Sequence, residues 1–271
     1  MGYYIRTKEG IKIYVEDINE NGADTLLFLH GWPGNNELFE YQFEELAKEG
    51  CRCIGIDQRG FGKSDKPFCG YDYDTLSDDV FSIIETLELK NVNLIGHSTG
   101  GAIAVRYMSR HRGKGIKKLI LCAAAAPSLI KRSYFPYGID KNVVEGIIRS
   151  TYIDRPKMLK NFGKIFFHKK VSEAFANWFL HLGFQAAGWS TGAIANTWLY
   201  EEKLFEDMKE IEVPTLILHG IHDKVCLFPL AEQQKYLIKN AKLIKFENSG
   251  HGLFYDERKK FNKEVLCFVR E

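Results

Sequence analysis

The chain has 271 residues, 45% of them hydrophobic and 27% charged, as expected for a globular protein with a sizeable core. Its formal net charge of +2 predicts neither a nucleic-acid partner nor a membrane surface as partner. No apolar run is long enough to cross a bilayer, and residues 1–6 carry no apolar signal region. The six cysteines contain no C-x-x-C pair, which favours buried free thiols and a cytoplasmic location.

Hydrophobic periodicity predicts strands and helices that alternate along most of the chain. In chain order these are strands Tyr3–Arg6, Ile11–Val15 and Thr25–Leu29, helix Asn36–Lys48, strand Cys51–Ile56, helix Thr75–Leu89, strand Val92–Ile95, helix Ala102–Met108, strands Lys117–Cys122 and Val213–His219, helix Pro229–Lys239, strand Ala241–Phe246 and helix Tyr255–Val269. The first two strands form a hairpin with Glu9-Gly10 at the turn. Apolar strands separated by helices predict an α/β protein whose mostly parallel sheet is covered on both faces.

One region interrupts this alternation. Residues 128–205 contain no obvious strand and are dense in aromatic side chains, some of them at helical spacing. We therefore predict a helical cap at 128–205, inserted into a core formed by 1–127 and 206–271. The alternative is a separate helical layer that fills core volume.

The segment Gly96-His97-Ser98-Thr99-Gly100 is a G-x-S-x-G pattern. An apolar strand precedes it and a helix-compatible run follows it. This is the context of a nucleophile elbow, a tight turn that holds a serine hydroxyl at the end of a strand. The pattern therefore predicts Ser98 as a nucleophile that attacks a carbonyl carbon.

A serine nucleophile needs a base, and the base needs an acid that orients it. Asp223 and His251 each follow a predicted strand, in the chain order that this kind of site uses. The carboxyl ends of parallel strands share one edge of the sheet, so we predict a triad of Ser98, Asp223 and His251. Asp256 follows His251 closely, and we interpret it as capping or preceding the last helix.

The oxyanion of the reaction needs backbone donors. We expect one from Thr99, directly after the serine, and one from Trp32, because Pro33 has no N–H. His30 is expected to brace its turn through hydrogen bonds. The substrate pocket is expected to include one residue beside the serine and several cap aromatics, namely His97, Phe162, Phe166, Trp178 and Trp189.

Other sites find little support in the sequence. The segment Asp57–Ser64 is glycine-containing, but it lacks the spacing of a phosphate-binding loop, and we interpret it as structural. No group of His, Cys and carboxylate residues has zinc-like spacing, so neither metal nor cofactor is expected.

Five segments together resemble the α/β-hydrolase family over nearly the whole chain: His30–Gly34, Asp57–Ser64, Gly96–Gly101, His219–Asp223 and Gly250–Gly252. The resemblance implies the α/β-hydrolase fold, with a helical cap inserted into a mostly parallel sheet. Trp32-Pro33, Ser98–Gly101 and Asp154–Pro156 are most similar to the cofactor-free haloperoxidases and aryl esterases. His97 and Cys226 depart from that branch, and both departures concern the pocket.

This resemblance implies a serine esterase that hydrolyses small esters and that, with hydrogen peroxide and a carboxylic acid, forms peracids. Water or peroxide would accept the acyl group, and no haem or metal would take part. The same triad also serves carbon–carbon bond hydrolases, thioesterases, acyltransferases and hydroxynitrile lyases. A ligand receptor with slow turnover is a further alternative. Haloalkane dehalogenases and epoxide hydrolases are disfavoured, because their nucleophile is an aspartate where this chain has Ser98.

Overall fold

The computed structural model describes residues 1–271 and contains an eight-stranded sheet in the order β1-β2-β4-β3-β5-β6-β7-β8. Its strands are β1 (Gly2–Arg6), β2 (Lys12–Ile18), β3 (Asp24–Leu29), β4 (Cys51–Ile56), β5 (Val92–His97), β6 (Ile116–Cys122), β7 (Thr215–Gly220) and β8 (Ala241–Phe246). The first two strands form the predicted antiparallel hairpin, and Gly10 takes a φ of 83° in its turn. The strands from β3 to β8 are parallel, which confirms the predicted mostly parallel sheet.

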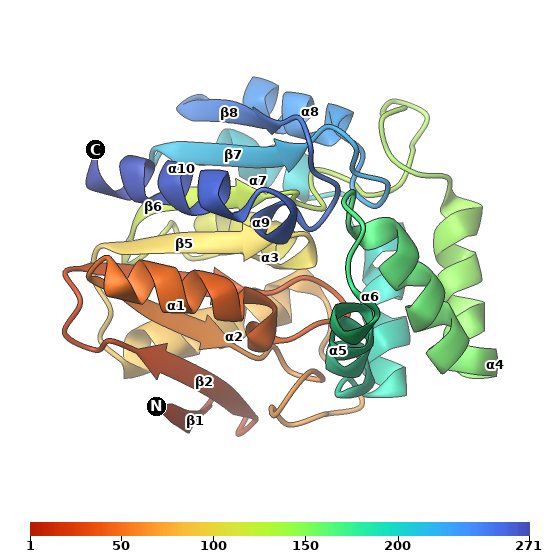
Figure 1. The fold of residues 1–271 in the computed structure, drawn as a ribbon, viewed down its shortest axis with the longest axis horizontal. Coiled ribbons are helices and arrows are strands. Elements are labelled where there is room, and N and C mark those ends of the chain that lie inside the picture. Colours follow the sequence, from red (N-terminus) through yellow and green to blue (C-terminus); the bar gives the residue numbers. More distant parts are fainter.

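Helices cover both faces of the sheet (Figure 1). The core helices are η1 (Asn36–Phe39), α1 (Glu40–Lys48), α2 (Tyr73–Thr86), α3 (Thr99–Arg110), α8 (Pro229–Leu237), α9 (Leu253–Asp256) and α10 (Arg258–Arg270). One face carries α1, α9 and α10, and the other carries α2, α3 and α8. Every residue of β5 is buried, as expected for a strand that packs against helices on both sides.

All five predicted helices differ from the structure in their bounds or are divided, and two of these differences have a clear local cause. The second begins at Tyr73 rather than Thr75, because the Asp72 side chain accepts a hydrogen bond from the Thr75 N–H (2.9 Å) and caps the helix two residues earlier than predicted. The helix predicted over 255–269 is divided into α9 and α10. Glu257, with φ −125° and ψ 51°, leaves helical geometry between them.

Between β6 and β7 the chain forms α4 (Lys141–Phe166), α5 (Glu173–Phe184), α6 (Gly188–Tyr200) and α7 (Leu204–Lys209). Figure 1 shows α4, α5 and α6 gathered at one end of the sheet, whereas α7 packs against α3 and α8. A kink at Asp154 (φ −153°) divides α4. The following Pro156 disfavours helical geometry nearby, and the Asp154 carboxylate caps the second half by accepting from Lys157 N (3.0 Å). The exact division into core and cap stays a prediction.

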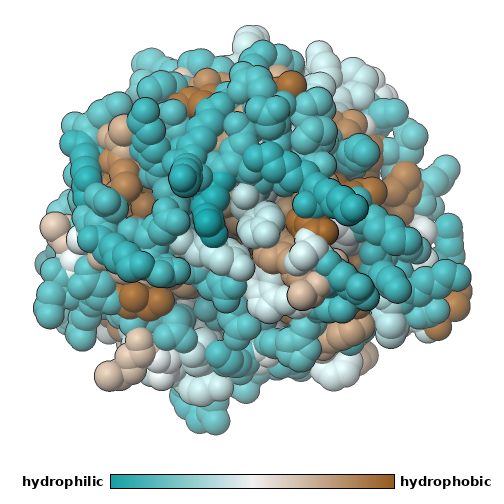
Figure 2. All heavy atoms as spheres, in the orientation of Figure 1, coloured by the Kyte–Doolittle hydropathy of each residue, from teal (hydrophilic) through white to brown (hydrophobic).

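The core is one continuous cluster of buried apolar side chains that includes both faces of the sheet and the inner side of the cap. On the face shown in Figure 2, apolar residues form small separate groups among hydrophilic ones. None of the helices combines the length and the apolar character that crossing a bilayer requires.

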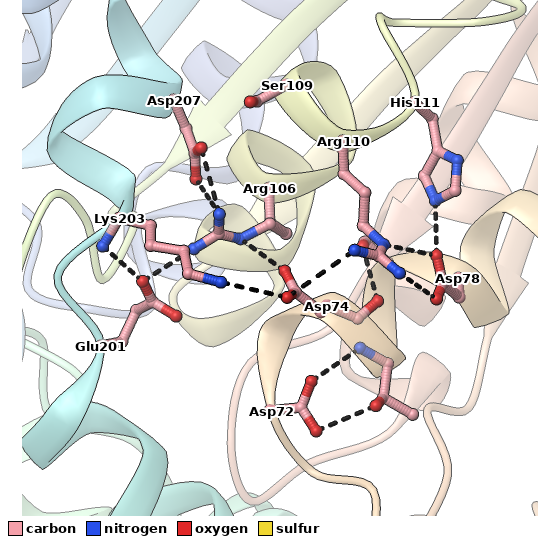
Figure 3. A network of polar contacts seen from close by, with 12 residues as sticks. Asp72, Asp74, Asp78, Arg106, Ser109, Arg110, His111, Glu201, Lys203 and Asp207 are labelled. Atoms are coloured by element: carbon pink, nitrogen blue, oxygen red, sulfur yellow. Dashed lines mark hydrogen bonds and ion pairs between the residues drawn. The ribbon is translucent and has the colours of Figure 1, made fainter.

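A buried ion network joins α3 to three other elements (Figure 3). The Arg106 guanidinium on α3 lies 3.3 Å from Asp74 on α2, 2.7 Å from Glu201 at the end of α6 and 2.9 Å from Asp207 on α7. The Arg106 side chain is 5% exposed. It therefore connects the helix that follows Ser98 to the end of the cap.

Replacing Arg106 by methionine is expected to lower the free energy of unfolding by about 3–5 kcal/mol, because it leaves buried carboxylates unpaired. Burial raises the pKa of Asp207 to about 6, and the nearby Arg106 opposes that rise. Without Arg106 the pKa rises further, so protonation of Asp207 at pH 5 relieves part of the loss. Urea denaturation at pH 5 and pH 8 should therefore show the larger loss of unfolding free energy at pH 8.

The control is Arg110→Met on the same helix. The Arg110 side chain is 40% exposed and pairs with Asp78, so its removal costs at most about 1 kcal/mol. Equal losses of unfolding free energy in the two variants would contradict the claim that the buried ion pairs of Arg106 stabilise the fold.

Candidate active site

Ser98 lies at the turn from β5 to α3, with φ 54° and ψ −120°. This is a backbone conformation that L residues rarely adopt. The neighbouring glycines permit the turn by their lack of a side chain. A Cβ on Gly96 would lie 2.5 Å from the Gly100 carbonyl oxygen, and one on Gly100 would lie 2.3 Å from that of Leu29. The close approach of α3 to β3 and β5 thus places Ser98 at the carboxyl edge of the sheet, as the sequence predicts.

Asp223 and His251 follow β7 and β8, and the structure brings them together. Asp223 Oδ2 lies 2.8 Å from His251 Nδ1. Asp223 Oδ1 accepts hydrogen bonds from the backbone N–H groups of Val225 (2.7 Å) and Cys226 (2.9 Å). Burial alone would raise the pKa of Asp223, but attraction and hydrogen bonding by His251 and His219 hold it well below its usual range. The ionised carboxylate therefore favours the tautomer with a proton on Nδ1, which leaves Nε2 as a base.

The hydrogen bond between Ser98 and His251 that the predicted triad requires is not formed in this structure. His251 Nε2 is buried and has no hydrogen-bond partner. Ser98 Oγ lies 3.9 Å from Cys226 Sγ instead. Such hydrogen bonds are often long in unliganded enzymes and tighten when substrate binds. Burial and the nearby Asp223 raise the pKa of Cys226 well above its usual value, so the thiol beside Ser98 stays protonated.

A second histidine at this carboxylate was not predicted. His219, at the end of β7, lies with Nε2 3.3 Å from Asp223 Oδ2 and 2.7 Å from the Cys226 carbonyl oxygen. It therefore holds the Asp223 loop through both the Asp223 carboxylate and the Cys226 carbonyl oxygen. Its position in the segment His219–Asp223 was visible in the sequence, but no local pattern distinguishes a supporting histidine from a surface one.

His97 was predicted to line the substrate pocket. Instead its ring packs against the His251 ring, and His97 does not line the cavity that extends from Ser98. Its Nε2 donates to the His251 carbonyl oxygen (3.1 Å), and the two rings lie 4.6 Å apart. Burial lowers the pKa of His97 well below its usual value, so this ring is neutral. Phe166, another predicted pocket residue, packs edge-on against the His251 ring at 5.0 Å. Both residues therefore position the His251 imidazole.

Asp256 precedes α10 as predicted, but its carboxylate has another function. It accepts hydrogen bonds from the N–H groups of Gly250 (2.8 Å), His168 (2.8 Å) and Lys169 (3.1 Å). It thereby ties the His251 loop to the segment between α4 and α5. The predicted bracing role of His30 is confirmed: its two ring nitrogens bond the Gly31 carbonyl oxygen and the Gln58 N–H, each at 3.0 Å.

A narrow cavity of about 70 Å³ extends from Ser98 between the sheet and the cap. It is lined by Trp32, Ser98, Leu129, Ile139, Val143, Ile147, Phe162, Ile165, Trp198, Lys224 and Val225. Of the five predicted pocket residues only Phe162 is among them. Trp189 lies elsewhere, with its indole N–H donating to the Pro67 carbonyl oxygen (2.9 Å), and Trp178 packs against Phe175. Helical spacing marks the apolar side of a cap helix but does not say which part of that side faces the serine.

The candidate oxyanion donors lie beside this cavity. Neither the Trp32 N–H nor the Thr99 N–H bonds a backbone carbonyl, so both are free to bind substrate. The Trp32 indole lines the cavity and donates to the Thr191 carbonyl oxygen of α6 (3.1 Å). Trp32 therefore connects the loop after β3 to the cap. No three metal-binding side chains come together in the structure.

The sheet order and the strand–turn–helix arrangement at Ser98 are those of an α/β hydrolase. A family model described as the alpha/beta hydrolase fold matches residues 24–258, and the chain belongs to that family.

Particular relatives define the branch more closely. The chain is similar to the solved structure of an esterase from Exiguobacterium antarcticum, with TM-score 0.97, 45% identity and both chains fully covered. It is also similar to a bromoperoxidase from Bacillus anthracis, with TM-score 0.95, 31% identity and both chains fully covered. An AB hydrolase superfamily protein of Bacillus subtilis is 48% identical over 99% of each chain. These relatives confirm the predicted fold and the esterase and haloperoxidase branch.

Proposed function

We propose that this protein hydrolyses small carboxylic esters through an acyl-enzyme on Ser98. One observation carries the proposal: the Asp223–His251 hydrogen bond of 2.8 Å leaves His251 Nε2 buried and unpartnered at the edge of the sheet where Ser98 stands. A neutral imidazole that is oriented by an ionised carboxylate is the general base that a serine nucleophile requires.

In the proposed mechanism, Ser98 Oγ turns from Cys226 toward His251 and attacks the ester carbonyl as Nε2 takes its proton. The charged imidazole is stabilised by Asp223, which stays ionised throughout. The N–H groups of Trp32 and Thr99 stabilise the oxyanion. His251 then gives its proton to the leaving alcohol, and in the second half it activates the acceptor that releases the acid.

The cavity supports short or slender acyl groups as substrates. Its volume of about 70 Å³ is small beside the roughly 300–1,000 Å³ of pockets that hold drug-sized ligands. Its walls are aliphatic and aromatic, and Lys224 is the one charged residue that lines it. We therefore propose acetyl to butyryl esters rather than long-chain esters as the preferred substrates.

Hydrogen peroxide is proposed as a second acyl acceptor. The similarity to the Bacillus anthracis bromoperoxidase over the full length of both chains supports it. Peroxide would replace water in attacking the acyl-enzyme, and the peracid formed would oxidise bromide in solution. Bromination of a phenolic dye in acetate, bromide and peroxide measures this activity.

The wild-type protein should release p-nitrophenol from p-nitrophenyl acetate in a burst of about one equivalent, followed by steady turnover, which is the kinetic fingerprint of an acyl-enzyme. A fluorophosphonate probe should block turnover and label Ser98, as located by peptide mass spectrometry. Turnover should fall as the acyl chain is lengthened from acetyl to octanoyl. Labelling without turnover would indicate a ligand receptor, and labelling at another residue would contradict the mechanism.

A further inference from the structure

A groove of about 490 Å³ lies on the outer side of the cap, between the second half of α4 and the start of α5. Its floor is apolar, with Leu159 on α4 and Phe179 and Leu180 on α5. Gly163 on α4 leaves the floor open, since it has no side chain to fill it. A volume of this size falls within the range of small-molecule sites.

The rim of this groove is basic. Lys160, Lys164, Lys169 and Lys170 line it, and no lining residue is acidic. None of the four forms an ion pair: the Lys164 ammonium donates to Asn161 Oδ1 (3.2 Å) and the Lys169 ammonium to the Asp256 carbonyl oxygen. An apolar floor below uncompensated positive charge is complementary to a molecule with an apolar chain and an anionic head.

The groove is distinct from the cavity at Ser98, and the two share no lining residue. The cavity uses Phe162 and Ile165 of α4, which point to the side of the helix opposite Lys160 and Gly163. The groove does reach the His251 loop indirectly, because the backbone of His168 and Lys169 holds the Asp256 carboxylate that also bonds Gly250.

We propose that this groove binds a single-chain anionic amphiphile, a medium-chain fatty carboxylate, as a second ligand outside the Ser98 cavity. The alkyl chain lies on the floor between α4 and α5, and the carboxylate meets the lysine rim. The proposal does not depend on the reaction at Ser98, since the two sites are formed by different residues.

Isothermal titration with dodecanoate below its micelle concentration tests this binding. We expect one ligand per chain, weaker binding as NaCl is raised, and unchanged binding after Ser98 is blocked with a fluorophosphonate. The variant Gly163→Leu should remove binding, because its added Cβ meets only the Phe179 ring at 3.5–3.7 Å while the rest of the side chain fills the floor. Lys160→Gln with Lys164→Gln should weaken binding roughly tenfold by removing two charges.

The control pair is Lys259→Gln with Lys263→Gln, which removes two exposed lysines at the same spacing from α10 and should leave binding unchanged. Dodecanol, which lacks the charge, should bind at least tenfold more weakly than dodecanoate. The proposal is overturned if neither groove variant alters affinity, if blocking Ser98 abolishes binding, or if the protein binds anionic phospholipid vesicles but not monomeric dodecanoate.

Discussion

Replacing Ser98 by alanine is expected to lower kcat for p-nitrophenyl acetate by about 10⁶-fold, close to the background rate. The reason is that the hydroxyl is the proposed nucleophile, and no other group at the edge of the sheet can take its place. The Cys226 thiol lies 3.9 Å away, but burial keeps it protonated and therefore poorly nucleophilic. Steady-state kinetics and loss of the acetate burst measure the effect.

Cys226→Ala is the matched control for this experiment. It removes the immediate neighbour of Ser98 without touching the Asp223–His251 pair, so we expect kcat to change by less than about tenfold. Circular dichroism and a thermal melt establish that both variants fold. If Ser98→Ala keeps a tenth or more of the activity while Cys226→Ala loses it, the nucleophile has been assigned to the wrong residue.

Asp223→Asn is expected to lower kcat by about 10⁴-fold while leaving the fold intact. An asparagine can still accept the N–H groups of Val225 and Cys226 on Oδ1. Its amide nitrogen would then donate to His251 Nδ1, which moves the imidazole proton to Nε2 and removes the base. The ratio of the variant and wild-type kcat values at pH 7 measures the effect.

Asp256→Asn distinguishes this effect from the loss of any buried carboxylate near His251. Asp256 is 4% exposed and bonds three backbone N–H groups rather than an imidazole. Its replacement should therefore lower the melting temperature more clearly than kcat, with a loss in rate of about tenfold or less. Equal rate losses in the two variants would mean that Asp223 acts only by holding its loop.

The positions of Ser98, Asp223 and His251 at one edge of the sheet could be predicted from the sequence, because a single rule places all three. Ser98, Asp223 and His251 each follow an apolar strand, and parallel strands bring their carboxyl ends together whatever the loops do. Two helix features also have local signals in the sequence: Asp72 is a good N-cap residue for α2, and Pro156 disfavours helical geometry just before it in α4.

The remaining features depend on tertiary packing. The aliphatic cavity walls, such as Leu129 and Ile147, carry no pattern that distinguishes them from ordinary core residues. Arg106 meets partners about 30 to 100 positions away in the chain, so no local spacing reveals the network. The prediction of Trp189 as a pocket residue was wrong for the same reason, since its side chain faces the Pro67 loop.

The attachment of the cap to the His251 loop has a consequence for how substrate enters. The end of α4 is fixed there, because the Phe166 carbonyl oxygen accepts from Gly252 N (2.9 Å) and Asp256 holds the next residues. Opening the cap at that end would displace His251 together with the cap. The start of α4, where Val143 is 52% exposed and lines the cavity, is attached instead to the segment after β6, because Ile139 bonds the backbone of Leu129 and Lys131. We therefore expect substrate and product to pass at the start of α4. Movement of that end of the helix opens the cavity while the end of α4 and the His251 loop keep their positions.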